Sequence, residues 1–91
     1  MTDQEILGLL KQNLNNPPSQ KDEYLTFLIT TSKVSIAKEG ISLDLEDAND
    51  VNLVVMYAAY LFRKRAEDNP VMPRMLRYAL NNRLFSEKMK P

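Results

Sequence analysis

The densest group of potentially reactive side chains in the sequence is a short acidic run containing Asp44, Glu46, Asp47 and Asp50. Clustered carboxylates can bind a divalent cation or act as general acid and base. A calcium-binding loop also needs a glycine at its sharp turn and a bidentate glutamate at its end, and this run has neither. We therefore interpret the acidic run as a solvated loop in which Asp47, or Asn49 after it, caps a following helix.

The other side chains that usually carry catalysis are missing from the sequence. It has no cysteine and no histidine, which excludes disulfides, thiolate or imidazole metal ligands, and Cys–His or Ser–His catalytic pairs. It has only two glycines and no glycine-rich loop that would cradle a phosphate. We expect no catalytic, cofactor-binding or metal-binding residues, and we infer that the protein is not an enzyme.

The charged residues are unevenly distributed along the chain. Residues 1–62 carry four lysines against nine acidic residues, whereas residues 63–91 carry eight basic residues against three acidic ones. This division indicates a charged partner, or other copies of the chain that dock front to back. Scatter over solvated helix faces would explain it equally well. The basic residues that would meet an acidic neighbour or DNA phosphates are Arg63, Lys64, Arg65, Arg74, Arg77 and Arg83.

Sequence-specific DNA binding is the less favoured use of this basic half. Domains that bind duplex DNA are usually basic overall, whereas this chain has a formal net charge of zero and a pI near 6.2. A helix-turn-helix motif needs a turn of about three or four residues, and residues 67–72 contain two acids and a proline instead. We expect the basic residues to face an acidic surface or DNA that passes through a pore.

Hydrophobic periodicity predicts the helices that would position these side chains. Thr2 and Glu5 fit a capping box at the start of the first helix, and the prolines at 17 and 18 would end it. Gly40 fits the left-handed position at the end of the second. The expected helices cover about residues 3–14, 20–39, 49–66 and 73–82. The sequence therefore predicts an all-α, bundle-like domain of four helices.

The third expected helix is apolar nearly all round, because Asn52 is the single polar residue between positions 51 and 62. Such a helix is normally surrounded by others, so we expect it at the centre of the domain. Residues 83–91 show no helix signal of their own and are expected to form an extended C-terminal tail. Leu84, Phe85 and Met89 would give this tail apolar anchors for another protein.

The apolar content exceeds what a core of this size comfortably hides. Five methionines, four tyrosines and three phenylalanines leave apolar surface for contacts between chains. No apolar run approaches the roughly 20 residues of a membrane span, and the polar N-terminus is unlike a signal peptide. We expect an intracellular protein that acts through protein–protein contacts.

Two segments combine these features in a distinctive way. Residues 56–60 read Met-Tyr-Ala-Ala-Tyr and lead into Arg63-Lys64-Arg65, and residues 72–82 read Met-Pro-Arg-Met-Leu-Arg-Tyr-Ala-Leu-Asn-Asn. Over about residues 20–89 the chain resembles the small head–tail connector proteins of long-tailed bacteriophages and related prophages. The resemblance lies in the whole pattern and includes no catalytic fingerprint.

The resemblance implies a four-helix fold with an assembly role and no enzymatic activity. Proteins of that family form a ring beneath the portal, extend the DNA channel, help to complete the packaged head and join it to the tail. It implies a homo-oligomer in the virion, compatible with a monomer in the host cytoplasm before assembly. The implied partners are the portal protein and a downstream stopper or tail-completion protein, with non-specific contact to packaged DNA and no membrane.

The resemblance also gives the candidate residues expected roles. The basic residues would meet either channel DNA or the acidic residues Asp44, Glu46 and Asp47 of a neighbouring subunit. Leu84, Phe85 and Met89 would dock on the portal. Two other functions stay open: a small DNA-binding regulator from a mobile element, and a helical module that binds one protein partner, such as a toxin-neutralising or scaffold protein.

Overall fold

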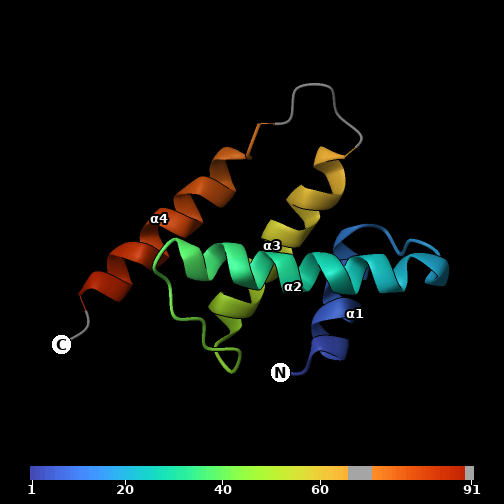
Figure 1. Ribbon diagram of the computed structural model, residues 1–91, viewed down its shortest axis with the longest axis horizontal. Helices are drawn as coiled ribbons and strands as arrows, with labels where there is room; N and C mark the ends of the chain where they lie inside the picture. The colour runs from blue at the N-terminus through green and yellow to red at the C-terminus, as the bar shows by residue number, and fades with distance from the viewer. Residues whose placement is uncertain (66–70, 90–91) are drawn as a thin grey trace.

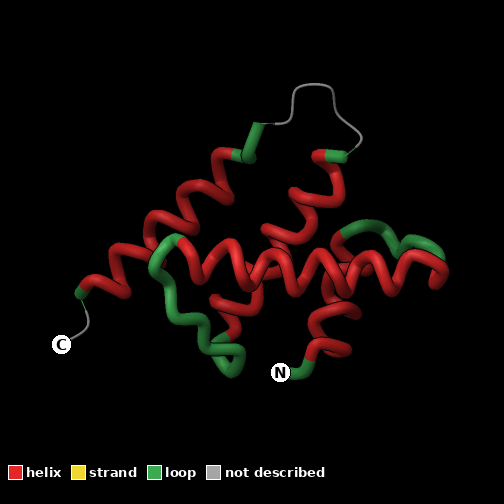
Figure 2. Tube along the Cα trace, viewed as in Figure 1, coloured by secondary structure: helices red, strands yellow, loops and turns green. Residues whose placement is uncertain are grey.

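The computed structural model describes residues 1–65 and 71–89. Its elements are α1 (Asp3–Asn13), a short 3₁₀ turn η1 (Ser19–Lys21), α2 (Asp22–Lys38), α3 (Ala48–Lys64) and α4 (Arg74–Lys88). In the part of the chain that is described, Figure 2 shows helices and loops and no strand. The expected all-α domain of four helices is confirmed.

The apolar helix α3 lies at the centre of the domain, as expected. α1, α2 and α4 all pack against it. Figure 1 shows α1 and α4 on opposite sides of α3, with α2 crossing in front of it. Val54 and Ala58 on α3 are completely buried. The core therefore lies where the other three helices meet α3, and the opposite faces of those helices remain at the surface.

Three local signals in the sequence act as predicted. The Thr2 N–H donates to Glu5 Oε1 at 3.0 Å, and the Glu5 N–H donates to Thr2 Oγ1 at 3.3 Å, which completes the capping box. After α1, Asn15 and Asn16 have φ values of 63° and 53°, a left-handed conformation that asparagine tolerates. Gly40 ends α2 with a φ of 100°, which glycine adopts without a steric penalty.

The helix boundaries differ slightly from those expected. α2 begins at Asp22, because residues 19–21 form the 3₁₀ turn, and α3 begins at Ala48 and ends at Lys64. Residue 66 of the expected third helix, residues 67–70 between the third and fourth expected helices and residues 90–91 of the expected tail lie outside the described residues.

The expected end of the last helix near residue 82 is wrong. α4 continues through Asn81 and Asn82 to Lys88, so residues 83–88 are helical and do not form an extended tail. Asparagine has low helix propensity, but tertiary contacts outweigh it here. Arg83 binds Asp50 on α3 at 2.7 Å, and the half-buried Leu84 packs against the hydrophobic core.

Candidate functional site

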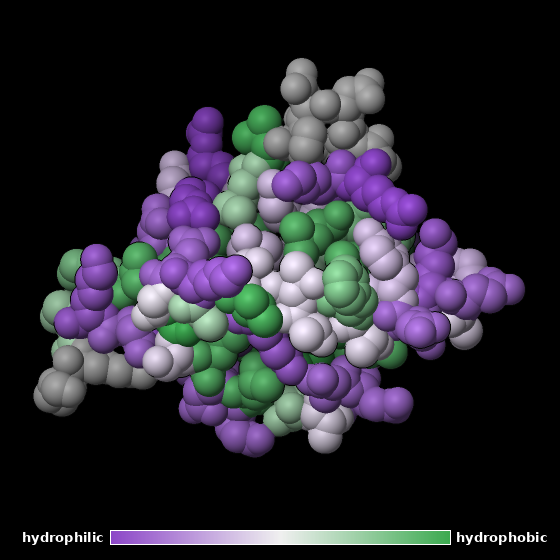
Figure 3. All heavy atoms as spheres, in the orientation of Figure 1, coloured by the Kyte–Doolittle hydropathy of each residue, from purple (hydrophilic) through white to green (hydrophobic). Residues whose placement is uncertain are grey.

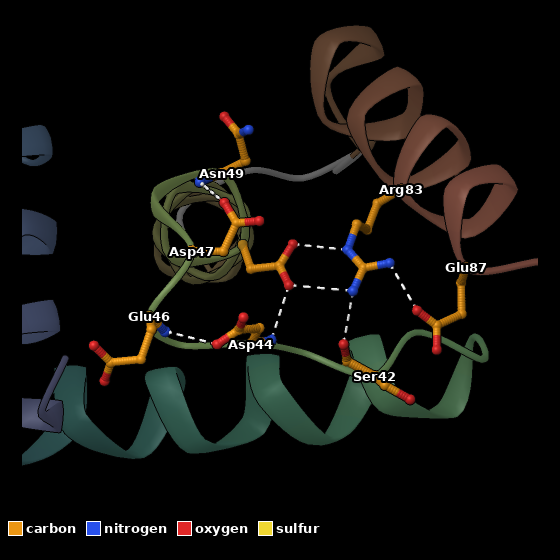
Figure 4. A network of polar contacts seen from close by, with 8 residues as sticks. Ser42, Asp44, Glu46, Asp47, Asn49, Arg83 and Glu87 are labelled. Atoms are coloured by element: carbon orange, nitrogen blue, oxygen red, sulfur yellow. Dashed lines mark hydrogen bonds and ion pairs between the residues drawn. The ribbon is translucent and has the colours of Figure 1, made fainter. Parts of the chain in front are cut away.

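A buried ion pair joins α4 to the start of α3. Asp50 is 1% exposed; its Oδ1 accepts a hydrogen bond from Arg83 Nε at 2.7 Å, and its Oδ2 accepts one from Nη2 at 3.2 Å. Asp50 Oδ2 also accepts the backbone N–H of Asp44 at 2.8 Å. Arg83 donates further to Glu87 Oε2 at 2.8 Å and to the Ser42 carbonyl at 2.7 Å. Figure 4 shows these contacts converging on the Arg83 guanidinium.

The electrostatics of this network are those of a structural anchor. Hydrogen bonds from Arg83 to Asp50, and then to Glu87, raise the pKa of Arg83 above its ordinary value. Both oxygens of Asp50 accept hydrogen bonds, so this carboxylate is held in place. Arg83 was expected at a subunit interface or in a DNA channel, but its side chain is only 16% exposed and binds within the molecule.

The remaining acidic residues of the loop are exposed. Asp47 caps α3, because its Oδ1 accepts the N–H of Asn49 at 2.8 Å; of the two capping residues considered, Asp47 is therefore the one used. Asp44 Oδ1 accepts the N–H of Glu46 at 3.0 Å, and Glu46 Oε1 lies 2.8 Å from the N-terminal amine. Within residues 1–65 and 71–89, no group of three potential ligands is placed to hold a metal ion.

The basic residues of α4 do not share one surface. Arg77 contacts both carboxylate oxygens of Glu39 at 3.1 Å each, and this pair joins α4 to the end of α2. Arg83 points towards the start of α3 and belongs to the buried network around Asp50 (Figure 4). Arg74, at the start of α4, is exposed.

The basic residues that end α3 fold back on the molecule. Arg63 donates to the end of α1 at 3.3 and 3.4 Å. The Lys64 ammonium lies 5.9 Å from the ring centre of Tyr60, and the Arg65 guanidinium lies 5.2 Å from that of Tyr24. Such cation–π contacts at exposed sites contribute about 0.5–1 kcal/mol each. These three residues are thus partly engaged at the end of α3 and lie apart from the acidic loop at its beginning.

Several large exposed apolar side chains lie along the outer face of α4. Met75, Tyr78, Phe85 and Met89 are exposed by 73%, 55%, 67% and 69%. Together with the exposed Asn82 they follow a spacing of three and four residues, which places them on one stripe of the helix. We call these five residues the α4 ridge. Hydrophobic atoms reach the surface at the left of Figure 3, over the C-terminal part of α4.

The three anchors expected in the tail divide between the two faces of α4. Phe85 and Met89 lie on the α4 ridge, whereas Leu84 is half-buried and packs against the core. A Cβ atom added to Gly40 would lie 3.4 Å from Leu84 Cδ1, so Leu84 covers the end of α2. The regular spacing of Phe85 and Met89 from Met75 was the signal in the sequence that could have placed them on one helix.

Among the described residues, no helix combines the length and apolarity needed to cross a membrane. The comparisons with known proteins give no match: no family model fits the chain, and no curated protein or solved structure is similar to it. What the protein does must therefore be inferred from its own surfaces and charges.

Proposed function

We propose that the protein is a phage or prophage head–tail connector subunit, which associates with copies of itself in a ring and docks beneath a portal. In that position it would extend the DNA channel, help to complete the packaged head and join it to the tail. The observation that carries the proposal is the α4 ridge, whose four apolar side chains are between 55% and 73% exposed. Large contiguous apolar surfaces on a protein usually mark binding sites for other proteins.

A second apolar surface supports a subunit with more than one neighbour. On α2, Phe27 and Val34 are exposed by 63% and 50%. They lie seven residues apart and therefore share one face of the helix. A ring of identical subunits needs two different surfaces on each subunit, and a connector needs further surface for the portal and the tail. The surfaces on α2 and α4 are consistent with that requirement.

The charged residues support the same class of function. The buried Asp50 and Arg83 bind each other, and Arg77 binds Glu39, so these groups hold the helices together. Exposed cations such as Arg74 and Lys88 remain at the surface, where they would meet an acidic neighbour or the phosphates of packaged DNA. The proposal therefore needs no catalytic group.

Electron microscopy of the chain mixed with the portal encoded beside it would test this function. We expect ring-shaped density attached to the portal, in a sample where both proteins co-purify. The matched control is Phe85→Glu combined with Met89→Glu, which places charge on the apolar ridge while leaving the buried face of α4 intact. This variant should keep its helical circular dichroism spectrum and lose the ring density.

Two other outcomes would contradict the proposal. Salt-sensitive binding of one particular DNA duplex by an isolated dimer, with no attachment to the portal, would identify a DNA-binding regulator. A stable one-to-one complex with a single other protein, which never extends into a ring, would identify a helical binding module instead.

A further inference from the structure

The α4 ridge has the spacing of a helix that packs against other helices. Met75, Tyr78, Asn82, Phe85 and Met89 are separated by three, four, three and four residues. This is the repeat with which one helix inserts its side chains between those of a neighbour. Leu76 and Leu80, on the inner face, are 1% and 0% exposed. The α4 ridge is therefore separate from the face of α4 that packs against the core.

The charged residues beside the α4 ridge indicate which kind of protein surface can bind it. Arg74 and Lys88 are exposed on α4, and the one acidic residue of α4, Glu87, binds Arg83 on the inner side. Two ridges packed antiparallel would bring Arg74 of one copy near Lys88 of the other. Like charges in such positions repel. A partner surface that combines carboxylates with apolar side chains therefore fits the α4 ridge better than the α4 ridge of another copy does.

The protein itself has a surface that combines apolar side chains with carboxylates, and this surface lies on the side of α3 opposite to α4. Two adjoining hollows, of about 460 and 390 Å³, lie between α1 and the N-terminal half of α3. Leu9, Val51 and Val55 supply apolar lining, and Glu5 and Glu46 supply carboxylates. We call this surface, defined by these five residues, the acidic groove. Leu9 is 39% exposed, whereas Val51 and Val55 are 3% and 5% exposed, so Leu9 is the one of these three apolar side chains that the groove offers to a partner.

The two carboxylates of the acidic groove have different surroundings. The backbone N–H and side chain of Thr2 hydrogen-bond to Glu5 and hold the pKa of that carboxyl below its ordinary value. Glu46 has a side chain that is 87% exposed and lies 2.8 Å from the amine of Met1. The amine of Met1 therefore lies beside Glu46 and also interacts electrostatically with Glu5.

We propose that the α4 ridge of one molecule docks in the acidic groove of a second copy. This inference rests on the proposed function and names the contact that would build the ring. α4 and α1 lie on opposite sides of α3 (Figure 1), so one molecule offers both surfaces at once. A contact between two different surfaces propagates from copy to copy, and it closes into a ring when the rotation divides a full turn.

The absence of cysteine from the sequence permits a direct test by disulfide trapping. Tyr78→Cys places a single thiol on the ridge, and Leu9→Cys places one in the acidic groove. In an oxidised mixture we expect the disulfide between positions 78 and 9 to dominate over the two homodimers. Thr30→Cys, on the exposed side of α2, is the matched control and should form few disulfides with position 78.

The trapping experiment is carried out both on the free chain at high concentration and on the chain bound to its portal. The inference is wrong if most disulfides join two Tyr78→Cys chains, or join a Tyr78→Cys chain to a Thr30→Cys chain. A ring on the portal without the 78–9 disulfide would also overturn it, but would leave the proposed function standing. The 78–9 disulfide in a chain that never attaches to a portal would support the contact and contradict the proposed function.

A pair of blocked variants tests the direction of the contact. Met75→Glu with Phe85→Glu blocks the ridge, and Leu9→Arg blocks the groove; circular dichroism confirms that both remain helical. Each variant alone should be monomeric by light scattering, whereas their mixture should form a one-to-one dimer and nothing larger. A dimer formed by the groove-blocked variant alone would show that ridges pair with each other, and would overturn the inference.

Discussion

The inner and outer faces of α4 have opposite surroundings although they belong to one helix. On the inner face, Leu76 and Leu80 are buried and Arg83 binds a buried carboxylate. On the outer face, Met75 and Phe85 are exposed by 73% and 67%. Both faces carry large apolar side chains, so residue type alone does not distinguish them. The difference shows which residues hold the domain together and which are left for a partner.

This comparison separates folding from association. A change on the inner face should lower the free energy of unfolding of the isolated chain. A change on the outer face should leave that free energy nearly unchanged and alter only the contacts between chains.

Removal of Arg83 should have the largest effect on stability. Arg83→Ala leaves Asp50 buried without its cation, and breaking a buried pair in this way costs about 3–5 kcal/mol. Domains of this size are stable by only about 5–15 kcal/mol, so the urea midpoint should fall sharply. Far-UV circular dichroism during urea unfolding measures the change. Arg74→Ala, at an exposed position, should alter stability by about 0.5 kcal/mol or less.

A double variant controls for the cause of this effect. Asp50→Asn combined with Arg83→Met removes both charges and keeps an oxygen to accept the Asp44 N–H. Replacing a buried ion pair by neutral groups of similar volume is often close to neutral, so this variant should recover much of the lost stability. If it is as unstable as Arg83→Ala, the uncompensated charge of Asp50 is not the cause.

The two faces of α4 can be compared directly with matched truncations. Leu80→Ala should cost about 2–5 kcal/mol, because it removes a fully buried side chain and leaves a cavity. Met75→Ala should change the free energy of unfolding by about 0.5 kcal/mol or less, and it should weaken assembly on the portal. Denaturant unfolding and sedimentation measure the two properties. Equal destabilisation by both variants would mean that the faces do not differ as described.

Acid should produce the smallest effect, at the capping box of α1. The folded state lowers the pKa of Glu5 from its ordinary value of 4.5, chiefly through the hydrogen bond from the Thr2 backbone. The stabilisation is therefore fully present above the unfolded-state pKa and is lost as the pH falls through the lower folded-state pKa. Thermal unfolding of the native chain and of Glu5→Gln, measured between about pH 6 and about pH 3, should converge at the acidic end.

Protonation of Glu5 should also affect the association between copies of the protein. It removes a negative charge from the acidic groove but leaves the cations beside the α4 ridge unchanged. Binding between copies should weaken over the same pH range as the capping box. Association that is unaffected by loss of the Glu5 charge would argue against the groove as the site of docking.

Much of the fold follows from local signals in the sequence. The capping box at Thr2, the glycine at position 40 and the aspartate cap at position 47 all act within a few residues of their own position. The central place of α3 follows from its apolar sequence, because a helix without a polar face must be covered on several sides. These features depend on short-range chemistry that a single sequence displays.

The buried network could not be predicted in the same way. Arg83 and Asp50 lie 33 residues apart, and nothing near either residue in the sequence identifies the other as its partner. Asn81 and Asn82 indicated a helix end, but the contacts of Arg83 and Leu84 continue α4 beyond them. The basic residues likewise looked like one group in the sequence. Their partners, Glu39 for Arg77 and Asp50 for Arg83, lie on different elements.

The contact between Arg83 and Asp50 also has a consequence for the order in which the chain folds. Burial of Asp50 is costly before its cation pairs with it, and that cation lies on α4. The start of α3 should therefore complete its burial only when α4 docks on it, whereas its partners on α1 and α2 precede α3 in the sequence.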